Sequence, residues 1–227
     1  MDTKIIIRYI FREIMGLVGM AVALFWSAGR LDWWGAWGAL AVMAGWILAT
    51  AIVIFRLNPS LLAERLGPRM GAKSWDTAIM SLLGLFQLAR YILAGLDQRY
   101  GWTGGFPQAA QLIALFICAV GYALVTWATA SNAYFSQIVR LQPERGQTVV
   151  ESGPYHTVRH PAYIGAVLYE TAVPVLLASW WAFIPSILCL LLLLLRTTLE
   201  DRMLQAELPG YAGYAARVRY RLLPGIW

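Results

Sequence analysis

Hydrophobic residues in this chain come in long unbroken runs and not in the alternating pattern of half-buried β-strands. A transmembrane helix needs about 20 predominantly apolar residues, so the pattern predicts helices that cross a bilayer and argues against an outer-membrane barrel. The candidate spans are Ile14–Ala28, Trp34–Phe55, Ala78–Leu96, Gln111–Ala130, Ala162–Ser179 and Trp181–Leu195. The last two together cover only about 35 residues, and we expect them to form a tilted or shallow hairpin.

Two polar stretches separate these runs. Residues 58–69, "NPSLLAERLGPR", begin with an Asn-Pro turn and continue in an amphipathic pattern, which indicates a short helix along the membrane surface or a plain loop. A hydrophilic window of about 30 residues opens at Ser131, and excursions of this length in a compact protein are more often functional than idle. Within it, Asn132, Tyr134 and Gln137 either cap the preceding helix or line a ligand pocket.

The residues after the last apolar run are amphipathic. Thr198 is placed to cap a helix that continues to Leu208, and Pro209-Gly210 then breaks that helix. Tyr211 and Tyr214 share one face of the piece that follows. This second piece is either an interfacial helix or a lid that folds back over the polar loop.

Composition supports a membrane protein. Of the 227 residues, 59% are hydrophobic and 13% charged, and the mean hydropathy is +0.59. A soluble domain of this length cannot bury so much apolar surface. We therefore predict an all-α, polytopic integral membrane protein with about five to six transmembrane helices, a short C-terminal helical hairpin and interfacial C-terminal helices. It forms one membrane domain over residues 1–227, with four spans in residues 1–130 and the loop, hairpin and lid in residues 131–227.

The basic residues give the orientation. Only Arg30 and Arg99 lie in the loops on one side. The other side carries Lys4, Arg8, Arg12, Arg56, Arg65, Arg69, Lys73, Arg140, Arg145, Arg159, Arg196, Arg202, Arg217, Arg219 and Arg221. By the positive-inside rule, both termini and the hydrophilic window face the cytoplasm. The net charge of +6 then reflects topology and attraction to anionic membrane lipid, and no nucleic-acid partner is expected.

Both histidines of the chain lie in one short stretch, "GPYHTVRHPAYIG", residues 153–165. His156 and His160 are four apart, but Pro161 pushes His160 out of the helical region, and a metal pair is therefore not expected. Proline is favoured at the first position of a helix, which makes His160 the predicted N-cap of the fifth span. The helix start, Arg159 and His160 then form a candidate anion site, and Tyr155 and Tyr163 add aromatic faces for a cation. A juxtamembrane anchor of basic and aromatic residues is the alternative.

Ionisable residues within the predicted spans are candidates for the acceptor side of a reaction. Glu170 lies midway along the fifth run and Arg90 inside the third, and charges at that depth usually face a partner or an internal cavity. They either form a structural pair or line a substrate cavity. Arg196, Arg217 and Arg219 either hold an anionic acceptor or anchor the chain in lipid headgroups. Cys118 and Cys189 lie inside apolar runs, where they are expected to be buried small side chains.

The stretch at residues 153–165, followed by an apolar hairpin and "LEDRMLQAELPGYAGYAARVRYRLLP", resembles the C-terminal signature of the isoprenylcysteine carboxyl methyltransferase and phospholipid N-methyltransferase superfamily. The resemblance is close from Gly153 to Pro224, and "NPSLLAERL" is similar to a segment of bacterial members, which implies a bacterial inner membrane.

The resemblance implies a membrane enzyme that transfers a methyl group from S-adenosylmethionine to an amphiphilic acceptor, a lipid-like carboxylate, amine or thiol. It implies cofactor contacts from the motif and from the paired acids after the hairpin, where Asp201 replaces the family's usual second glutamate. The predicted cofactor-binding residues are Tyr155, Arg159, His160, Pro161, Tyr163, Glu200 and Asp201. The predicted acceptor-side catalytic residues are Arg217, Arg219 and Glu170, and no metal is expected.

Two other functions remain open at this point. A membrane reductase of the sterol type that uses NADPH has a related hairpin and a similar His-Pro-x-Tyr element, with Arg217–Arg221 as the basic segment for a 2′-phosphate. A transporter or scaffold would leave the motif and the paired acids unexplained, and no inverted repeat is evident.

Overall fold

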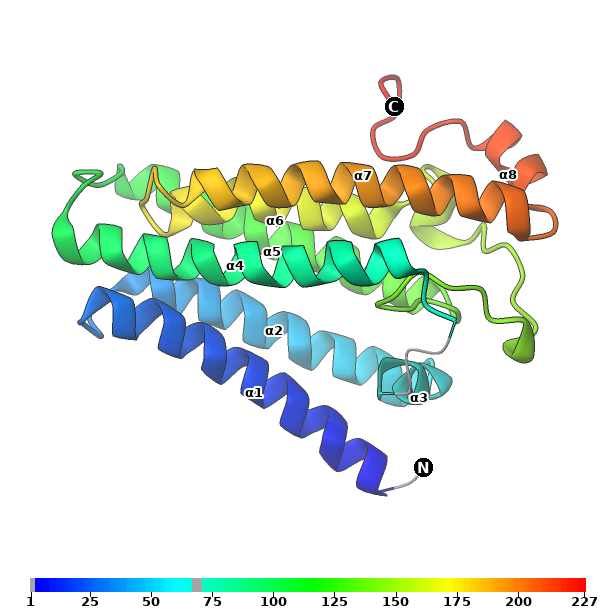
Figure 1. The fold of residues 1–227 in the computed structure, drawn as a ribbon, viewed down its shortest axis with the longest axis horizontal. Coiled ribbons are helices and arrows are strands. Elements are labelled where there is room, and N and C mark those ends of the chain that lie inside the picture. Colours follow the sequence, from blue (N-terminus) through cyan, green and yellow to red (C-terminus); the bar gives the residue numbers. More distant parts are fainter. Residues whose placement is uncertain (1–2, 67–70) are drawn as a thin grey trace.

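The computed structural model describes residues 3–66 and 71–227. It is a bundle of long helices with two shorter ones at one end (Figure 1). The helices are α1 (Thr3–Ala28), α2 (Trp34–Arg56), α3 (Ser60–Leu66), α4 (Ser74–Tyr100), α5 (Gln108–Ser131), α6 (Pro161–Leu176), α7 (Phe183–Glu207) and α8 (Tyr211–Arg217). Two 3₁₀ turns, Pro143–Arg145 and Gly153–His156, lie between α5 and α6. No strand occurs in the described ranges, which confirms the all-α prediction.

Four helices in the described part of the chain, α2, α4, α5 and α7, are long and apolar enough to cross a membrane. The shorter α6, with 16 residues, occupies the predicted fifth span. The helix α1, which carries Lys4, Arg8, Arg12 and Glu13 in its first half, occupies the predicted first span but is not among the four. Helices therefore form at all six predicted positions, and length and composition support membrane crossing for four of them.

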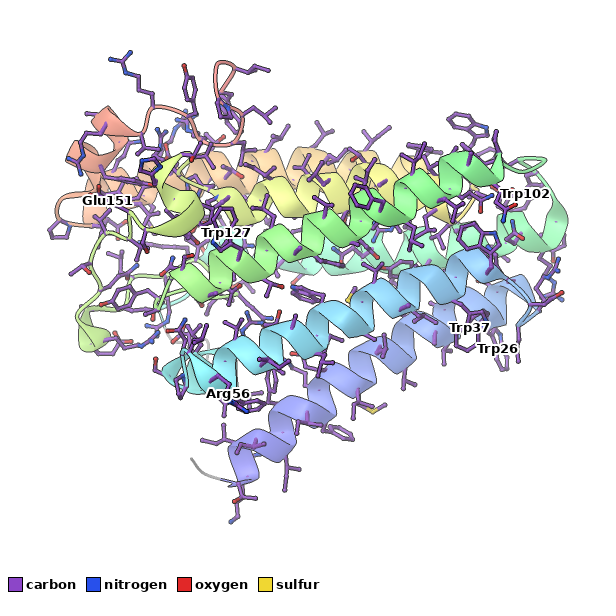
Figure 2. The ribbon with its side chains drawn as sticks, turned by 180° about the vertical axis from the view of Figure 1, so that it is seen from behind. Trp26, Trp37, Arg56, Trp102, Trp127 and Glu151 are labelled. Atoms are coloured by element: carbon purple, nitrogen blue, oxygen red, sulfur yellow. The ribbon has the colours of Figure 1, made fainter. Side chains whose placement is uncertain are left out.

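Side chains on the outside of the bundle suit a lipid environment. Trp26 is 85% exposed, and Figure 2 places it with Trp37 and Trp102 at the end of the bundle far from Arg56 and Glu151. Tryptophan is enriched where a bilayer meets water, so these rings mark one interface. The end of the bundle with α3 and α8 also holds the long segment 132–160 and both chain termini (Figure 1).

Small residues let α5 and α6 approach each other closely. A Cβ atom added at Gly121 would lie 2.6 Å from the Gly165 carbonyl oxygen, and a Cβ at Gly165 would overlap the Gly121 carbonyl in turn. Transmembrane helices pack through such small-residue contacts because lipid provides no hydrophobic drive between them. The α5–α6 contact sets the position of the motif, since α6 begins at Pro161.

The sequence placed one helix boundary wrongly. Thr198 does not cap a new helix, because α7 runs without a break to Glu207 and the Thr198 hydroxyl donates to the Leu194 carbonyl, 2.9 Å away, within that helix. The helix therefore carries Glu200 and Asp201 on a rigid extension of the hairpin. The break at Pro209-Gly210 is confirmed, and α8 begins just after it. Cys118 and Cys189 are buried, as predicted.

Candidate functional site

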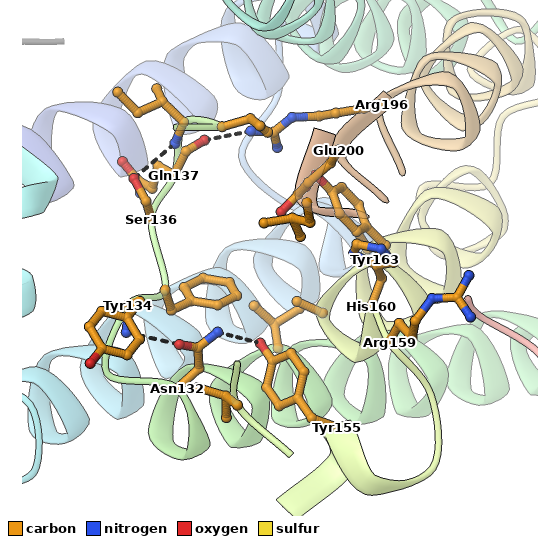
Figure 3. A pocket seen from close by; sticks show the side chains of 18 of the residues that line it. Asn132, Tyr134, Ser136, Gln137, Tyr155, Arg159, His160, Tyr163, Arg196 and Glu200 are labelled. Atoms are coloured by element: carbon orange, nitrogen blue, oxygen red, sulfur yellow. Dashed lines mark hydrogen bonds between the residues drawn. The ribbon is translucent and has the colours of Figure 1, made fainter. Parts of the chain in front are cut away.

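A cavity of about 450 Å³ opens at the α3–α8 end of the bundle, a volume within the usual range for small-molecule sites (Figure 3). Its walls come from α2 to α8 and from the segment between α5 and α6. The lining continues from this segment to the middle of the helices, where Met43, Trp46, Gln87 and Tyr122 contribute. The end near the loops is the polar end. The end within the bundle, lined mainly by methionine and aromatic side chains together with Gln87 and Glu170, is the more apolar one.

The motif at residues 153–165 forms one wall of the polar end. His160 is the N-cap residue of α6 and Pro161 its first residue, as the sequence predicted. Gly153 has a φ of +59°, and a Cβ there would lie 2.9 Å from the Ser131 Cβ atom, so the turn after α5 needs glycine at this position. This turn places Tyr155, Arg159 and His160 in the cavity lining.

Asp201 is the centre of a buried polar network beneath that wall. Its carboxylate has no exposed surface, and Arg159 donates to both of its oxygens through Nε at 2.7 Å and Nη2 at 3.0 Å. The His160 Nε2 atom lies 3.2 Å from Oδ1. Further donors are the Tyr211 hydroxyl, the Arg221 guanidinium and the Gln205 amide. Asp201 does not line the cavity; it fixes the two motif residues that do.

The C-terminal segment, residues 209–227, is held against the motif by backbone and side-chain contacts. The Arg159 and His160 amides donate to the Tyr220 and Arg221 carbonyls, at 3.0 and 2.9 Å. The Tyr214 hydroxyl donates to the Tyr155 carbonyl at 2.6 Å. Tyr211 and Tyr214 are buried and line the cavity, so this segment is part of the wall.

Glu200 faces the cavity from α7, one residue from Asp201 but in different surroundings. The Tyr163 hydroxyl donates to its carboxylate, and no basic residue among the described residues forms an ion pair with it. The Arg196 guanidinium lies 5.6 Å from the centre of the Tyr163 ring and is paired with Asp76. Glu200 therefore keeps free acceptor capacity toward a bound ligand, whereas Arg196 already has its carboxylate.

The opposite wall is the segment after α5. The Asn132 side chain accepts from the Tyr134 amide at 2.8 Å and donates to the Tyr155 hydroxyl at 3.3 Å, so it holds the turn just after α5 and lines the cavity (Figure 3). Glu64 on α3 binds Arg140 and the Ser136 hydroxyl, and the hydrogen bond from Arg140 lowers the pKa of the Glu64 carboxyl. Helix α3 thus fixes this wall.

Glu170 and Arg90 form a buried ion pair within the bundle. The Gln87 amide donates to the same carboxylate at 3.3 Å, and Glu170 and Gln87 both line the inner part of the cavity. The sequence predicted either an ion pair between Glu170 and Arg90 or a place for Glu170 in a cavity wall. The structure shows both, since Glu170 is paired with Arg90 and also lines the cavity. Next to it, the Trp46 ring stacks on Tyr122 with centroids 4.8 Å apart, and the Tyr169 ring packs against Tyr122 in a tilted arrangement at 4.5 Å.

The structure separates the predicted site residues into two groups. Those that line the cavity are Tyr155, Arg159, His160, Tyr163, Glu170 and Glu200. Pro161, Asp201, Arg217 and Arg219 are outside its lining. Arg217 is exposed and paired with Glu151, and Arg219 contacts the motif through its carbonyl, which accepts from Arg159 at 2.7 Å. Arg217 and Arg219 are thus kept from the cavity by the direction in which the C-terminal segment runs.

Several lining residues were not predicted from the sequence. The main ones are Trp46, Arg65, Gln87, Tyr122 and Tyr169. Each lies in an apolar run or amphipathic stretch whose inward face a single sequence does not reveal. The one available signal was polarity inside a span, which Gln87 shares with Arg90. Among the described residues, no group of three or more His, Cys, Asp and Glu side chains is arranged to hold a metal ion.

One protein-family model matches part of this chain. Residues 112–206 match the model of the isoprenylcysteine carboxyl methyltransferase family. No curated protein matches the chain. A solved structure of the eukaryotic intramembrane Ras methyltransferase, isoprenylcysteine carboxyl methyltransferase without a monobody, is similar over 96% of this chain and 86% of that chain, with a TM-score of 0.44 and 15% identity. The family match contains the motif and the cavity-facing part of α7.

Proposed function

We propose that this chain is an integral membrane methyltransferase and that its methyl donor is S-adenosylmethionine, because residues 112–206 match the model of the isoprenylcysteine carboxyl methyltransferase family. We propose that the polar end of the cavity holds this donor and that the apolar end holds part of an amphiphilic acceptor. The observation that carries the proposal is the convergence of Tyr155, Arg159, His160, Tyr163 and Glu200 on one cavity.

The residues at the polar end fit such a donor. S-adenosylmethionine supplies a methyl group on a positively charged sulfur, together with a carboxylate, an amine and ribose hydroxyls. Glu200 keeps acceptor capacity for hydroxyl or amine donors, since within the described part of the chain only the Tyr163 hydroxyl is bonded to it. The His160 ring lies on the same wall, where Asp201 and the carbonyls of Val218 and Arg219 hold the Arg159 guanidinium in place. These are the partners that a zwitterionic ligand requires.

Catalysis then depends on alignment and exclusion of water. Methyl transfer is an in-line displacement in which the acceptor's electron pair forms the new bond to carbon while the carbon–sulfur bond breaks. The protein needs to hold the two reactants in contact and to keep water away. The buried Tyr211 and Tyr214 close the cavity on one side, and the network around Asp201 keeps the motif wall rigid.

The acceptor we propose is a lipid-like molecule with a carboxylate, amine or thiol as the reacting group. Met43, Trp46, Met80 and Leu193 provide apolar lining within the bundle, where an alkyl or isoprenoid chain is compatible with the wall. The family's name points to a prenylated cysteine carboxylate as the first acceptor class to test.

We infer that the cavity opens to the cytoplasm, and a bacterial inner membrane is the proposed location. Figure 1 places α3, α8 and both termini at the cavity end. The basic residues of these segments lie at the same end, whereas the opposite end carries Arg30 and Arg99. An excess of basic residues on one side indicates the cytoplasmic side.

The reductase alternative has no observation in its favour. The arginines that the sequence offered for a 2′-phosphate, Arg217, Arg219 and Arg221, do not line the cavity. Arg221 is bound to Asp201 and Arg217 to Glu151. The acidic Glu200 at the polar end also disfavours a cofactor with an additional phosphate.

Calorimetric titration of the purified protein with S-adenosylhomocysteine and with NADPH tests the donor. We expect binding of S-adenosylhomocysteine and none of NADPH. His160→Ala should weaken the first by about 1–3 kcal/mol, the range for a hydrogen bond to a charged group. His156 is exposed and outside the cavity lining, so His156→Ala is the matched control and should leave affinity unchanged. Tight NADPH binding without a response to S-adenosylhomocysteine would refute the proposal.

A further inference from the structure

Among the described residues, four arginines line the cavity, and three of them have a carboxylate partner. Arg140 is paired with Glu64, Arg159 with Asp201, and Arg196 with Asp76. The fourth is Arg65 on α3. Within residues 3–66 and 71–227, no carboxylate lies at ion-pair distance from its guanidinium. Arg65 is thus set apart from every other basic side chain in the cavity wall.

Arg65 is also buried. Its exposed fraction is 7%, and its Nε atom has no hydrogen-bond partner among the described residues. Burial lowers the pKa of the Arg65 guanidinium, against the attraction of the more distant Tyr9 and Glu13. Glu13 forms its ion pair with Arg12 and none with Arg65. A buried guanidinium without a partner is costly, and such a group is stabilised when an anion binds to it.

The surroundings of α3 hold this side chain in the cavity wall. Leu61 and Leu62 are buried against α1 and α2, which fixes the inner face of the helix. The neighbouring Glu64 is tied to Arg140 and Ser136. The Arg12 guanidinium donates to the Arg65 carbonyl and to the Gln137 side chain, and so joins α3 to the loop wall. The position of Arg65 is therefore fixed by contacts that do not use its own guanidinium.

We propose that Arg65 binds the anionic group, a carboxylate or a phosphate, of a ligand in this cavity, and that this ligand is the methyl acceptor. The second clause rests on the proposed function. A planar guanidinium binds either anion through paired N–H donors. The acceptor is therefore an anionic amphiphile, whose charge lies at the α3 wall while its hydrocarbon part occupies the apolar lining.

The donor's own carboxylate is the other source of such an anion, and the arrangement of the walls favours the acceptor. Arg12 links Arg65 to Gln137, and Figure 3 shows Ser136 and Gln137 on the opposite side of the cavity from Arg159 and His160. The residues proposed for the donor are on that second side. An acceptor held at the α3 wall would face a donor held at the motif wall, which is the relation that transfer between them requires.

The test is the charge selectivity of binding, measured without turnover. N-acetyl-S-farnesylcysteine and laurate are each titrated against their own uncharged amides, with the full-length protein in nanodiscs. We expect the wild type to prefer the carboxylates by about 10- to 100-fold, as for a charge-assisted hydrogen bond. Arg65→Gln should remove this preference, and Arg65→Lys should retain part of it. Arg56→Gln, an exposed arginine at the end of α2, is the matched control and should change nothing.

The outcomes separate the possible sources. Loss of carboxylate preference in Arg65→Gln with unchanged S-adenosylhomocysteine affinity supports the assignment to the acceptor. Weaker S-adenosylhomocysteine binding with the carboxylate preference retained would overturn it, because the anion would then belong to the donor. A wild type that does not distinguish acid from amide for either probe would also overturn it. If the preference depends on Arg65 while S-adenosylhomocysteine does not bind at all, the methyl-donor proposal fails and the anion site stands.

Discussion

Asp201→Ala is expected to lower turnover by about 100-fold, the cost of misplacing a substrate by about 1 Å, and to destabilise the protein. The substitution leaves Arg159 and Arg221 buried or half-buried without their carboxylate, and removing one partner of a buried ion pair costs about 3–5 kcal/mol. His160 and Tyr211 lose the same acceptor. The motif and the C-terminal segment then lose their common attachment to α7.

Thermal unfolding and single-turnover kinetics, measured on the same preparations, test this expectation. Asp201→Asn should be the milder variant, because its remaining carbonyl oxygen still accepts from Arg159. Glu200→Gln is the matched control on the neighbouring residue: it should leave the unfolding temperature nearly unchanged and weaken S-adenosylhomocysteine binding. An unfolding temperature that stays the same in Asp201→Ala would contradict the structural role given to this carboxylate.

Deleting residues 209–227 should abolish turnover and leave the long helices folded. The deletion removes Tyr211 and Tyr214 from the cavity wall, together with the carbonyls that accept from the Arg159 and His160 amides. The cavity would then be open to water on the side of the motif, which weakens electrostatic contacts and exposes the reacting groups. None of the long helices depends on this segment for its own backbone hydrogen bonds.

Circular dichroism of the truncated protein provides the control for folding, and methyl transfer with S-adenosylhomocysteine titration provides the functional measure. A narrower variant, Tyr214→Phe, removes the 2.6 Å hydrogen bond to the Tyr155 carbonyl and keeps the ring. It should lower turnover far less than the truncation does. Full activity of the truncated protein would show that the segment only attaches the chain to the membrane surface.

Local features of this protein could be predicted from the sequence because they depend on neighbouring residues. Pro161 fixed the start of α6 and placed His160 at its N-cap, and Pro209-Gly210 marked the break before α8. The Glu170–Arg90 ion pair could also be predicted from the sequence, since two charges inside apolar runs have few other partners in a bilayer. These predictions need only steric rules and the cost of burying charge.

Features that depend on distant contacts could not be predicted. Asp201 matched a cofactor residue by its place in the family pattern, yet its partners come from residues 159–160, 211 and 221, which only the folded chain brings together. The position of Arg65 follows from the contacts of α3 with α1, α2 and the loop wall, which are not visible in the pattern around residue 65. The charge of Arg217 and Arg219 made them candidates for binding the acceptor, but the path of the C-terminal segment turns them away from the cavity.

The most direct test of the central claim is transfer of a deuterated methyl group from labelled S-adenosylmethionine, followed by mass spectrometry. Membranes that contain the protein are incubated with the labelled donor, their own lipids and added N-acetyl-S-farnesylcysteine. The proposed function predicts a labelled methyl on an amphiphile with the wild type and with His156→Ala, and a strongly reduced yield with His160→Ala. An unlabelled lipid fraction with the wild type, or equal labelling by His160→Ala, would contradict it.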